Sequence, residues 1–114
     1  MLHKMRLEHK PFMQIKERTK TVEMRLNDEK RSKLRVGDVI EFTDLSDGAK
    51  MNCAVKNLFK YPSFYELYKN HGSQSIGYGE GEAADPADMY DYYSQENIEK
   101  YGVVGIEVEV LNAE

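Results

Sequence analysis

Residues 20–25 (KTVEMR) place three ionisable side chains and a threonine in six positions that otherwise read as a β-strand. Because side chains alternate across a strand, Thr21, Glu23 and Arg25 share one face, and the intervening apolar residues share the other. A carboxylate and a guanidinium on one face can bind polar or charged groups. The same pattern also fits an ordinary solvated strand whose charges pair with neighbouring strands.

Lys20 is the ambiguous member of this run. Strict alternation from Glu23 puts Lys20 on the apolar face, unless the strand begins after it and the amine projects from a turn. A lysine acts as a base at neutral pH only if its pKa is lowered, which Arg25 would favour and Glu23 would oppose. We name Lys20 and Glu23 as the candidate catalytic pair, base and acid. In RNA cleavage, Lys20 or Arg25 would instead stabilise the charge on phosphorus.

The length of 114 residues predicts one domain, residues 1–114, with a core of its own. The sequence contains no run of 18 apolar residues and no basic-then-apolar leader, so we expect a soluble, cytoplasmic protein that does not bind a membrane. Cys53 is the single cysteine, which excludes an intramolecular disulfide. Its place in an alternating strand predicts a small buried side chain rather than a catalytic thiol.

Charge is distributed unevenly along the chain. Residues 1–36 contain 11 Lys or Arg and 5 Asp or Glu, whereas residues 37–114 contain 5 and 15. If the basic residues of the first third converge, they form a local anion site on an acidic protein. The alternative is that the two halves neutralise each other in space.

The order of predicted elements indicates an α+β protein. Alternation and turn signals predict strands at 2–7, 20–26, 39–42, 51–59 and 103–111, and helices or helical turns at 11–18, 30–34, 63–72, 85–93 and from 94. This order favours a small curved sheet or partly closed barrel without long parallel crossovers. Met51, Cys53, Val55 and Phe59 are predicted to share a face, and the last strand to have one buried face.

Other segments yield weaker predictions. The glycines of residues 72–84 match neither phosphate-loop pattern and predict a mobile loop. Tyr90, Tyr92 and Tyr93 can stack on unpaired bases, or can simply cover the edge of the core. The three histidines lack the spacing of a zinc site, so we expect no metal and no cofactor.

An ordered set of motifs resembles the ASCH domain family. The motifs are Pro11-Phe12-x-x-Ile15, residues 20–26 (KTVEMRL), residues 36–42 (VGDVIEF), Tyr61-Pro62-Ser63-Phe64-x-x-Leu67 and residues 101–106 (YGVVGI). Together they cover nearly the whole chain. The central family pattern is Gly-x-Lys-x-x-Glu-x-Arg, and Arg18 stands here at its glycine position.

The resemblance implies a PUA-like fold, which is a small β-barrel of about five strands with short flanking helices. It also implies binding of RNA or a nucleotide in a cleft bordered by Lys20, Glu23 and Arg25. We add Thr21 from the same strand as a ligand-binding candidate. Lys30 and Arg31, in the basic first third, complete the predicted site at its rim.

Some ASCH proteins resemble hydrolases that remove the acetyl group from N4-acetylcytidine, using a lysine, a threonine and a glutamate. Lys20 matches the lysine, but Glu23 stands at the threonine position. The alternative function is therefore a small hydrolase acting on a modified nucleoside or on RNA. A third interpretation is a protein-interaction module that uses the acidic, tyrosine-rich stretch 61–101.

Overall fold

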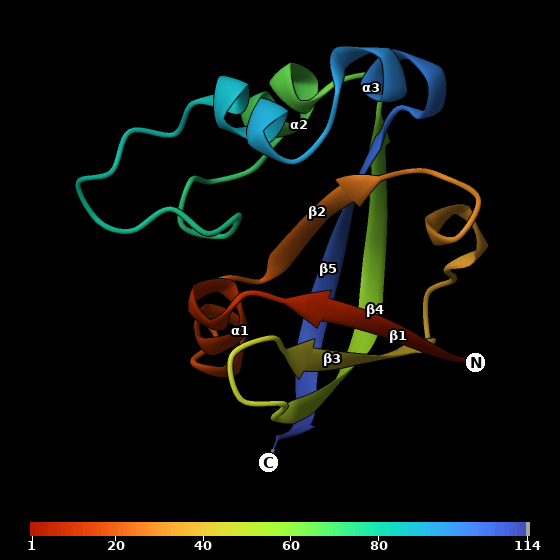
Figure 1. Ribbon diagram of the computed structural model, residues 1–114, viewed down its shortest axis with the longest axis vertical. Helices are drawn as coiled ribbons and strands as arrows, with labels where there is room; N and C mark the ends of the chain where they lie inside the picture. Colours follow the sequence, from red (N-terminus) through yellow and green to blue (C-terminus); the bar gives the residue numbers. More distant parts are fainter. Residues whose placement is uncertain (114) are drawn as a thin grey trace.

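The computed structural model describes residues 1–113, which form a curled five-stranded half-barrel with short helices (Figure 1). The strands are β1 (Leu2–Leu7), β2 (Val22–Leu26), β3 (Val39–Asp44), β4 (Lys50–Tyr61) and β5 (Val103–Ala113), in the order β1-β3-β4-β5-β2. β1 and β3 are parallel, whereas the other three pairs are antiparallel. The expected absence of a long parallel crossover is therefore wrong, because the chain passes through a helix and β2 between β1 and β3.

Within residues 1–113, five short helices connect the strands. They are α1 (His9–Lys16), η1 (Arg31–Lys33), α2 (Phe64–Asn70), η2 (Pro86–Asp91) and α3 (Gln95–Tyr101). The hydroxyls of Ser63 and Ser94 accept hydrogen bonds from backbone N–H groups three residues later and so cap α2 and α3, as local capping signals predict. The helix expected at 85–93 is instead a 3-10 helix that ends at Asp91.

β4 is the long central strand, and a bulge divides it. Its pairing with β5 shifts register between Val55 and Asn57, which reverses the faces of the residues that follow. Leu58 therefore packs with the core inside the half-barrel. Phe59 lies against His71, with ring centroids 4.9 Å apart. The expectation that Phe59 shares the face of Met51 is wrong because alternation alone does not reveal the extra residue.

Two clusters of buried side chains stabilise the fold. The larger lies inside the half-barrel beneath α1 and includes Phe12, Ile40 and Phe42. The second lies between β2, β5 and residues 62–102, and we call this segment, with its helices and loops, the cap. Because the cap covers the second face of the sheet, residues 103–106 of β5 are buried on both sides, and the expectation of a single buried face is wrong for this half.

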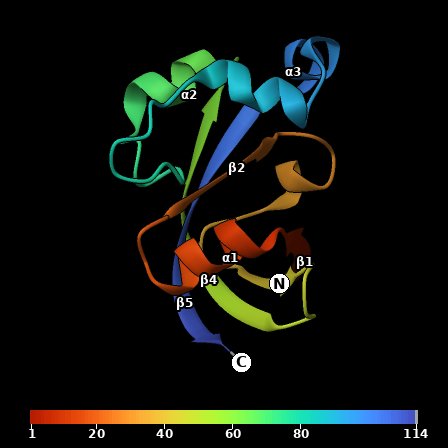
Figure 2. The ribbon, with the colours of Figure 1, turned by 60° about the vertical axis from the view of Figure 1, so that its left-hand side comes forward.

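The cap lies at one end of β4 and β5, next to β2, and α1 lies on the other side of β2 (Figures 1 and 2). α2 contacts β4, β5 and η2, and α3 contacts β2. Residues 72–85, which precede η2, contain turns without a regular helix or strand. Within residues 1–113, every helix falls short of the length and apolar character needed to cross a bilayer.

Candidate functional site

A tight turn delivers the chain from α1 into β2. The backbone N–H groups of Thr19 and Lys20 both donate to the Gln14 carbonyl, at 3.0 and 3.1 Å. Arg18 closes the turn in the left-handed conformation, with φ of 67°. Because β2 begins only at Val22, Lys20 lies outside the alternating strand and projects toward the polar face. The open question about its direction is thus answered by the turn.

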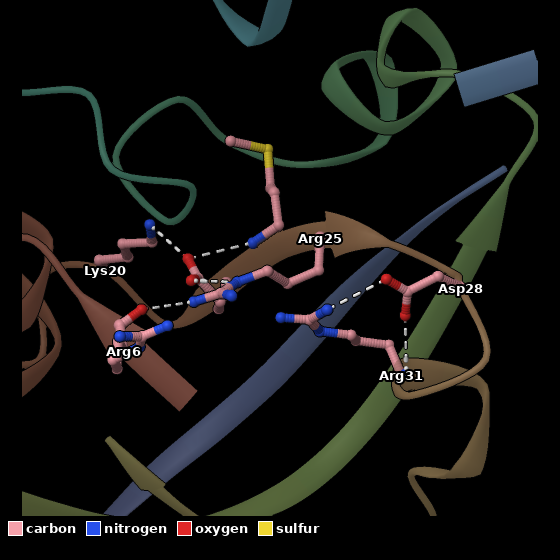
Figure 3. A network of polar contacts seen from close by, with 7 residues as sticks. Arg6, Lys20, Arg25, Asp28 and Arg31 are labelled. Atoms are coloured by element: carbon pink, nitrogen blue, oxygen red, sulfur yellow. Dashed lines mark hydrogen bonds and ion pairs between the residues drawn. The ribbon is translucent and has the colours of Figure 1, made fainter. Parts of the chain in front are cut away.

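Lys20, Glu23 and Arg25 form a buried ionic cluster, and Figure 3 labels its two cations, Lys20 and Arg25. Glu23 Oε1 lies 2.8 Å from Lys20 Nζ, and Glu23 Oε2 accepts a 2.9 Å hydrogen bond from Arg25 Nε. The backbone N–H of Met24 also donates to Oε1, at 3.2 Å. Arg25 Nη2 donates to the Arg6 carbonyl at 2.9 Å, which links β2 to β1. Only 7% of Lys20 and 4% of Glu23 is exposed.

The cluster keeps Glu23 ionised. Burial alone would raise the pKa of its carboxyl, but the charges and hydrogen bonds of Lys20 and Arg25 outweigh burial and lower the pKa to about 2. A carboxyl in that state has no proton to donate at neutral pH. The geometry therefore does not favour the general-acid role considered for Glu23, and instead makes this carboxylate the group that orients two cations.

The cluster lines a cavity of about 520 Å³ between the sheet and the cap. The volume lies within the range of small-molecule sites. From β1, α1 and β2 the lining includes Arg6, Lys10, Gln14 and the ionic cluster, and from the cap it includes Tyr68, Tyr78, Asp88, Asp91, Tyr92 and Tyr93. In total, four basic and five acidic side chains line the cavity. The basic first third of the chain thus faces acidic residues of the cap.

The backbone of the cap lies close to the Lys20 side chain at Gly77. Its φ is 111°, and an added Cβ would lie 3.2 Å from Lys20 Cδ and 3.5 Å from Nζ. The Gly77 carbonyl accepts a 3.0 Å hydrogen bond from Gln14 Nε2, which joins the loop to α1. A side chain at position 77 would meet both backbone strain and crowding against the lysine. The glycine therefore permits the close approach that buries Lys20.

Three other predicted ligand-binding residues lie apart from this cavity. Thr21 lines a second, smaller cavity of about 320 Å³, which Lys20 also borders. Lys30 is exposed, and Arg31 Nη1 donates to Asp28 Oδ2 at 3.0 Å. None of the three is among the residues lining the larger cavity within the described chain. The structure thus brings together Lys20, Glu23 and Arg25 from the predicted set.

The sequence did not predict that the hydroxyl groups of Tyr68 and Tyr78 form hydrogen bonds at the cavity. Tyr68 Oη and Tyr78 Oη are 2.9 Å apart, and Tyr78 donates to Asp88 Oδ2 at 2.8 Å. Of the three tyrosines for which base stacking and covering of the core edge were the alternatives, Tyr92 and Tyr93 line the cavity, whereas Tyr90 does not. The concentration of all eight tyrosines at or beyond position 61 was the one available signal.

A separate group of potential metal ligands lies at the β3–β4 hairpin. Ligand atoms of His9, Asp44 and Asp47 lie within 4.8 Å of one another. His9 Nδ1 and Asp44 Oδ2 are already hydrogen-bonded at 2.7 Å, and Asp47 accepts a hydrogen bond from the backbone of Ala49. These contacts explain the group as part of a turn. Histidine spacing did not predict it because its members are distant in sequence.

Comparison with known proteins supports the same family across the chain. The ASCH domain model matches residues 5–112. The crystal structure of hypothetical protein PH0355 has a TM-score of 0.83 and 31% identity, covering 97% of this chain and 100% of the other. The solution NMR structure of protein PF0455 from Pyrococcus furiosus has a TM-score of 0.77 and 36% identity, covering 98% and 99%.

A search of curated proteins finds no match. The full-length structural matches agree with the half-barrel and its helical cap. The family model spans the turn at Arg18, the ionic cluster and the closing strand. This chain therefore belongs to the ASCH domain family, which is generally described as RNA-binding.

Proposed function

We propose that the cavity binds RNA, or a nucleotide, through Lys20 and Arg25. The observation that carries this proposal is the buried amine of Lys20 at the cavity wall. An ammonium group has three N–H donors, and Glu23 is its one ion-pair partner within residues 1–113. The remaining donors are available to an acceptor on a ligand, where a charge-assisted hydrogen bond is strong.

Arg25 supplies the second donor group. Its Nε is used by Glu23 and its Nη2 by the Arg6 carbonyl, which fixes the plane of the guanidinium. The side chain lines the cavity, so its remaining N–H groups complement a phosphate or the acceptor edge of a base. Tyr92 and Tyr93, on the cap side, offer rings for base stacking. On this proposal Glu23 positions the two cations and does not itself contact the ligand.

The predicted rim residues have a separate place in this proposal. Lys30 and Arg31 precede and begin η1, outside the cavity, so they would contact RNA that continues beyond it. Thr21 would act at the second cavity, which it shares with Lys20. A cytoplasmic location, where such ligands occur, remains our prediction.

Binding of short single-stranded RNA tests the proposal. Lys20→Met keeps an unbranched apolar side chain near Gly77, and Arg25→Gln retains part of the hydrogen-bonding capacity. We expect each variant to bind at least about tenfold more weakly, because each loses a charge-assisted hydrogen bond. Fluorescence anisotropy measures the affinity, and circular dichroism monitors the fold.

Lys100→Met is the matched control because it removes the same charge from an exposed position of α3, outside the cavity. Its affinity for RNA should remain within about twofold of that of the unmodified protein, as screened surface charges contribute little. Unchanged binding in both Lys20→Met and Arg25→Gln, with folded proteins, would contradict the proposal.

Hydrolysis of a modified nucleoside amide or of RNA is the second candidate function. It is favoured by a buried amine in a cavity of suitable size, where Lys20 or Arg25 would stabilise developing negative charge. Both oxygens of Glu23 are engaged, so this residue would orient Lys20 rather than attack the substrate. Incubation with acylated cytidines and with labelled RNA should give product that disappears in Lys20→Met. If neither the acylated cytidines nor the labelled RNA gives product, this reaction is excluded.

A further inference from the structure

The cap side of the cavity contains a chain of hydrogen bonds with a defined direction. Tyr78 Oη lies 2.8 Å from the Asp88 carboxylate and 2.9 Å from Tyr68 Oη. Tyr78 Oη also lies 3.1 Å from the Asp85 carbonyl, and because a carboxylate and a carbonyl only accept, Tyr78 donates its single proton to these two groups. Tyr68 must then donate to Tyr78. Burial raises the pKa of both tyrosines, so both protons are retained at neutral pH.

This direction makes the cap wall an acceptor surface. The proton of Tyr68 is used within the chain, so toward a ligand in the cavity its oxygen can only accept a hydrogen bond. Asp88 and Asp91 line the same cavity and also accept hydrogen bonds when ionised. We call Tyr68, Tyr78 and Asp88 the acceptor wall.

The side chains that α1 and β2 contribute to the cavity have the complementary character. Lys20 and Arg25 reach the cavity from the α1–β2 side and have no acceptor atoms on their side chains. A ligand that contacts both sets of side chains therefore needs an acceptor group for the cations and an N–H donor for the acceptor wall. A phosphate meets only the first requirement, because near the acceptor wall it would face carboxylates.

We propose that the acceptor wall selects a nucleobase with an exocyclic amino group over one with a carbonyl at the same position. This inference rests on the proposed function, since it assumes that a base enters the cavity. An amino group donates a hydrogen bond to Tyr68 or Asp88. A carbonyl oxygen would leave that acceptor unpaired and would meet its lone pairs directly. The expected ligand class is thus an amino-bearing base, such as cytosine or adenine, within an RNA strand.

Pairs of short oligonucleotides test the selection with phosphate charge held constant. One pair contains only cytosine or only uracil, and the other contains only adenine or only hypoxanthine. The members of each pair differ by an amino group in place of a carbonyl and by the adjacent ring nitrogen, which has a proton only in the carbonyl member. We expect the unmodified protein to prefer the amino member by about tenfold or more, measured by fluorescence anisotropy.

Tyr78→Phe isolates the direction of the hydrogen-bond chain. The substitution removes the acceptor of the Tyr68 proton, which frees Tyr68 to donate to a carbonyl. The preference should therefore fall to about twofold or less, largely through tighter binding of the uracil and hypoxanthine strands. Tyr90→Phe is the matched control, because Tyr90 is exposed and outside the cavity lining, and it should retain the preference.

The outcomes distinguish a failure of this inference from a failure of the proposed function. Equal affinity for amino and carbonyl strands, with binding still lost in Lys20→Met, would overturn the acceptor wall and leave the binding site standing. A preference that survives in folded Tyr78→Phe would also overturn it. Failure of all four strands to bind the unmodified protein would overturn both proposals.

Discussion

Glu23 and Asp44 are two buried carboxylates in different regions of the same small protein. Glu23 is 4% exposed and lies between Lys20 and Arg25 at the cavity. Asp44 is 1% exposed and lies at the β3–β4 hairpin. Its Oδ1 accepts hydrogen bonds from the backbone N–H and hydroxyl of Ser46, and its Oδ2 is bonded to His9 Nδ1.

The two carboxylates differ in how many hydrogen-bond donors remain free on the residues that contact them. The two bonds from Ser46 to Asp44 close the hairpin turn itself. Glu23 instead holds two cations whose remaining N–H donors reach a cavity of about 520 Å³. Burial of a charge is thus common to a structural turn and a candidate site. Hydrogen-bonding capacity that remains free at a cavity distinguishes the two.

Glu23→Gln should cause the largest loss of stability. The substitution keeps the volume of the side chain but leaves Lys20 and Arg25 buried without a counter-charge. Removal of one partner from a buried ion pair costs about 3–5 kcal/mol. Urea denaturation should show this decrease in the free energy of unfolding, and RNA binding should weaken because the cations lose their positions.

Asp44→Asn is the matched substitution at the other buried carboxylate. Asparagine can still accept a hydrogen bond from Ser46, so we expect a smaller loss of stability than for Glu23→Gln. RNA binding by the folded variant should remain unchanged, because Asp44 does not line the cavity. Weaker RNA binding in folded Asp44→Asn would remove the distinction between the two regions.

A pH titration sharpens the same comparison. The folded pKa of Glu23 is about 2, below its ordinary value of 4.5, so protonation of Glu23 is favoured in the unfolded chain. Its stabilisation is complete above about pH 4.5 and is lost as the pH falls toward 2. The shift corresponds to about 3 kcal/mol. The stability difference between the unmodified protein and Glu23→Gln should therefore narrow across this window, and a constant difference would show that Glu23 does not titrate in this way.

Local sequence signals predicted those parts of the fold that depend on neighbouring residues. Ser63 and Ser94 cap helices through residues three positions away, and the Asp47–Gly48 signal marks the hairpin. The bulge after Val55 was not predicted, because it depends on pairing with a strand some 50 residues later. Alternation within β4 gives no sign of that register shift.

The candidate site also contains a part that local sequence predicted and a part that depends on the tertiary fold. Alternation predicted that Glu23 and Arg25 share a face, whereas Lys20 was placed beside them only by the resemblance to the family. The carbonyl of Arg6 and the hydroxyl of Tyr78 reach the cavity only through strand order and the path of the cap. A backbone acceptor has no residue-type signal, and a tyrosine is equally suited to covering a core.

Each of the two regions contains a turn residue with a positive φ, but the residue types differ. Arg18→Gly tests that difference. The hairpin uses Gly48, with φ of 78°, whereas the turn into the site uses Arg18, with φ of 67°. A non-glycine residue in this conformation costs about 1 kcal/mol, so Arg18→Gly should increase the free energy of unfolding by up to that amount. Gly48→Ala should decrease it by a similar amount, since its Cβ would meet no atom within 4 Å and conformation alone is at issue. If Arg18→Gly stabilises the protein but weakens RNA binding, the arginine contributes to binding at the expense of stability. A decrease in the free energy of unfolding would instead show that contacts of the Arg18 side chain outweigh the backbone strain.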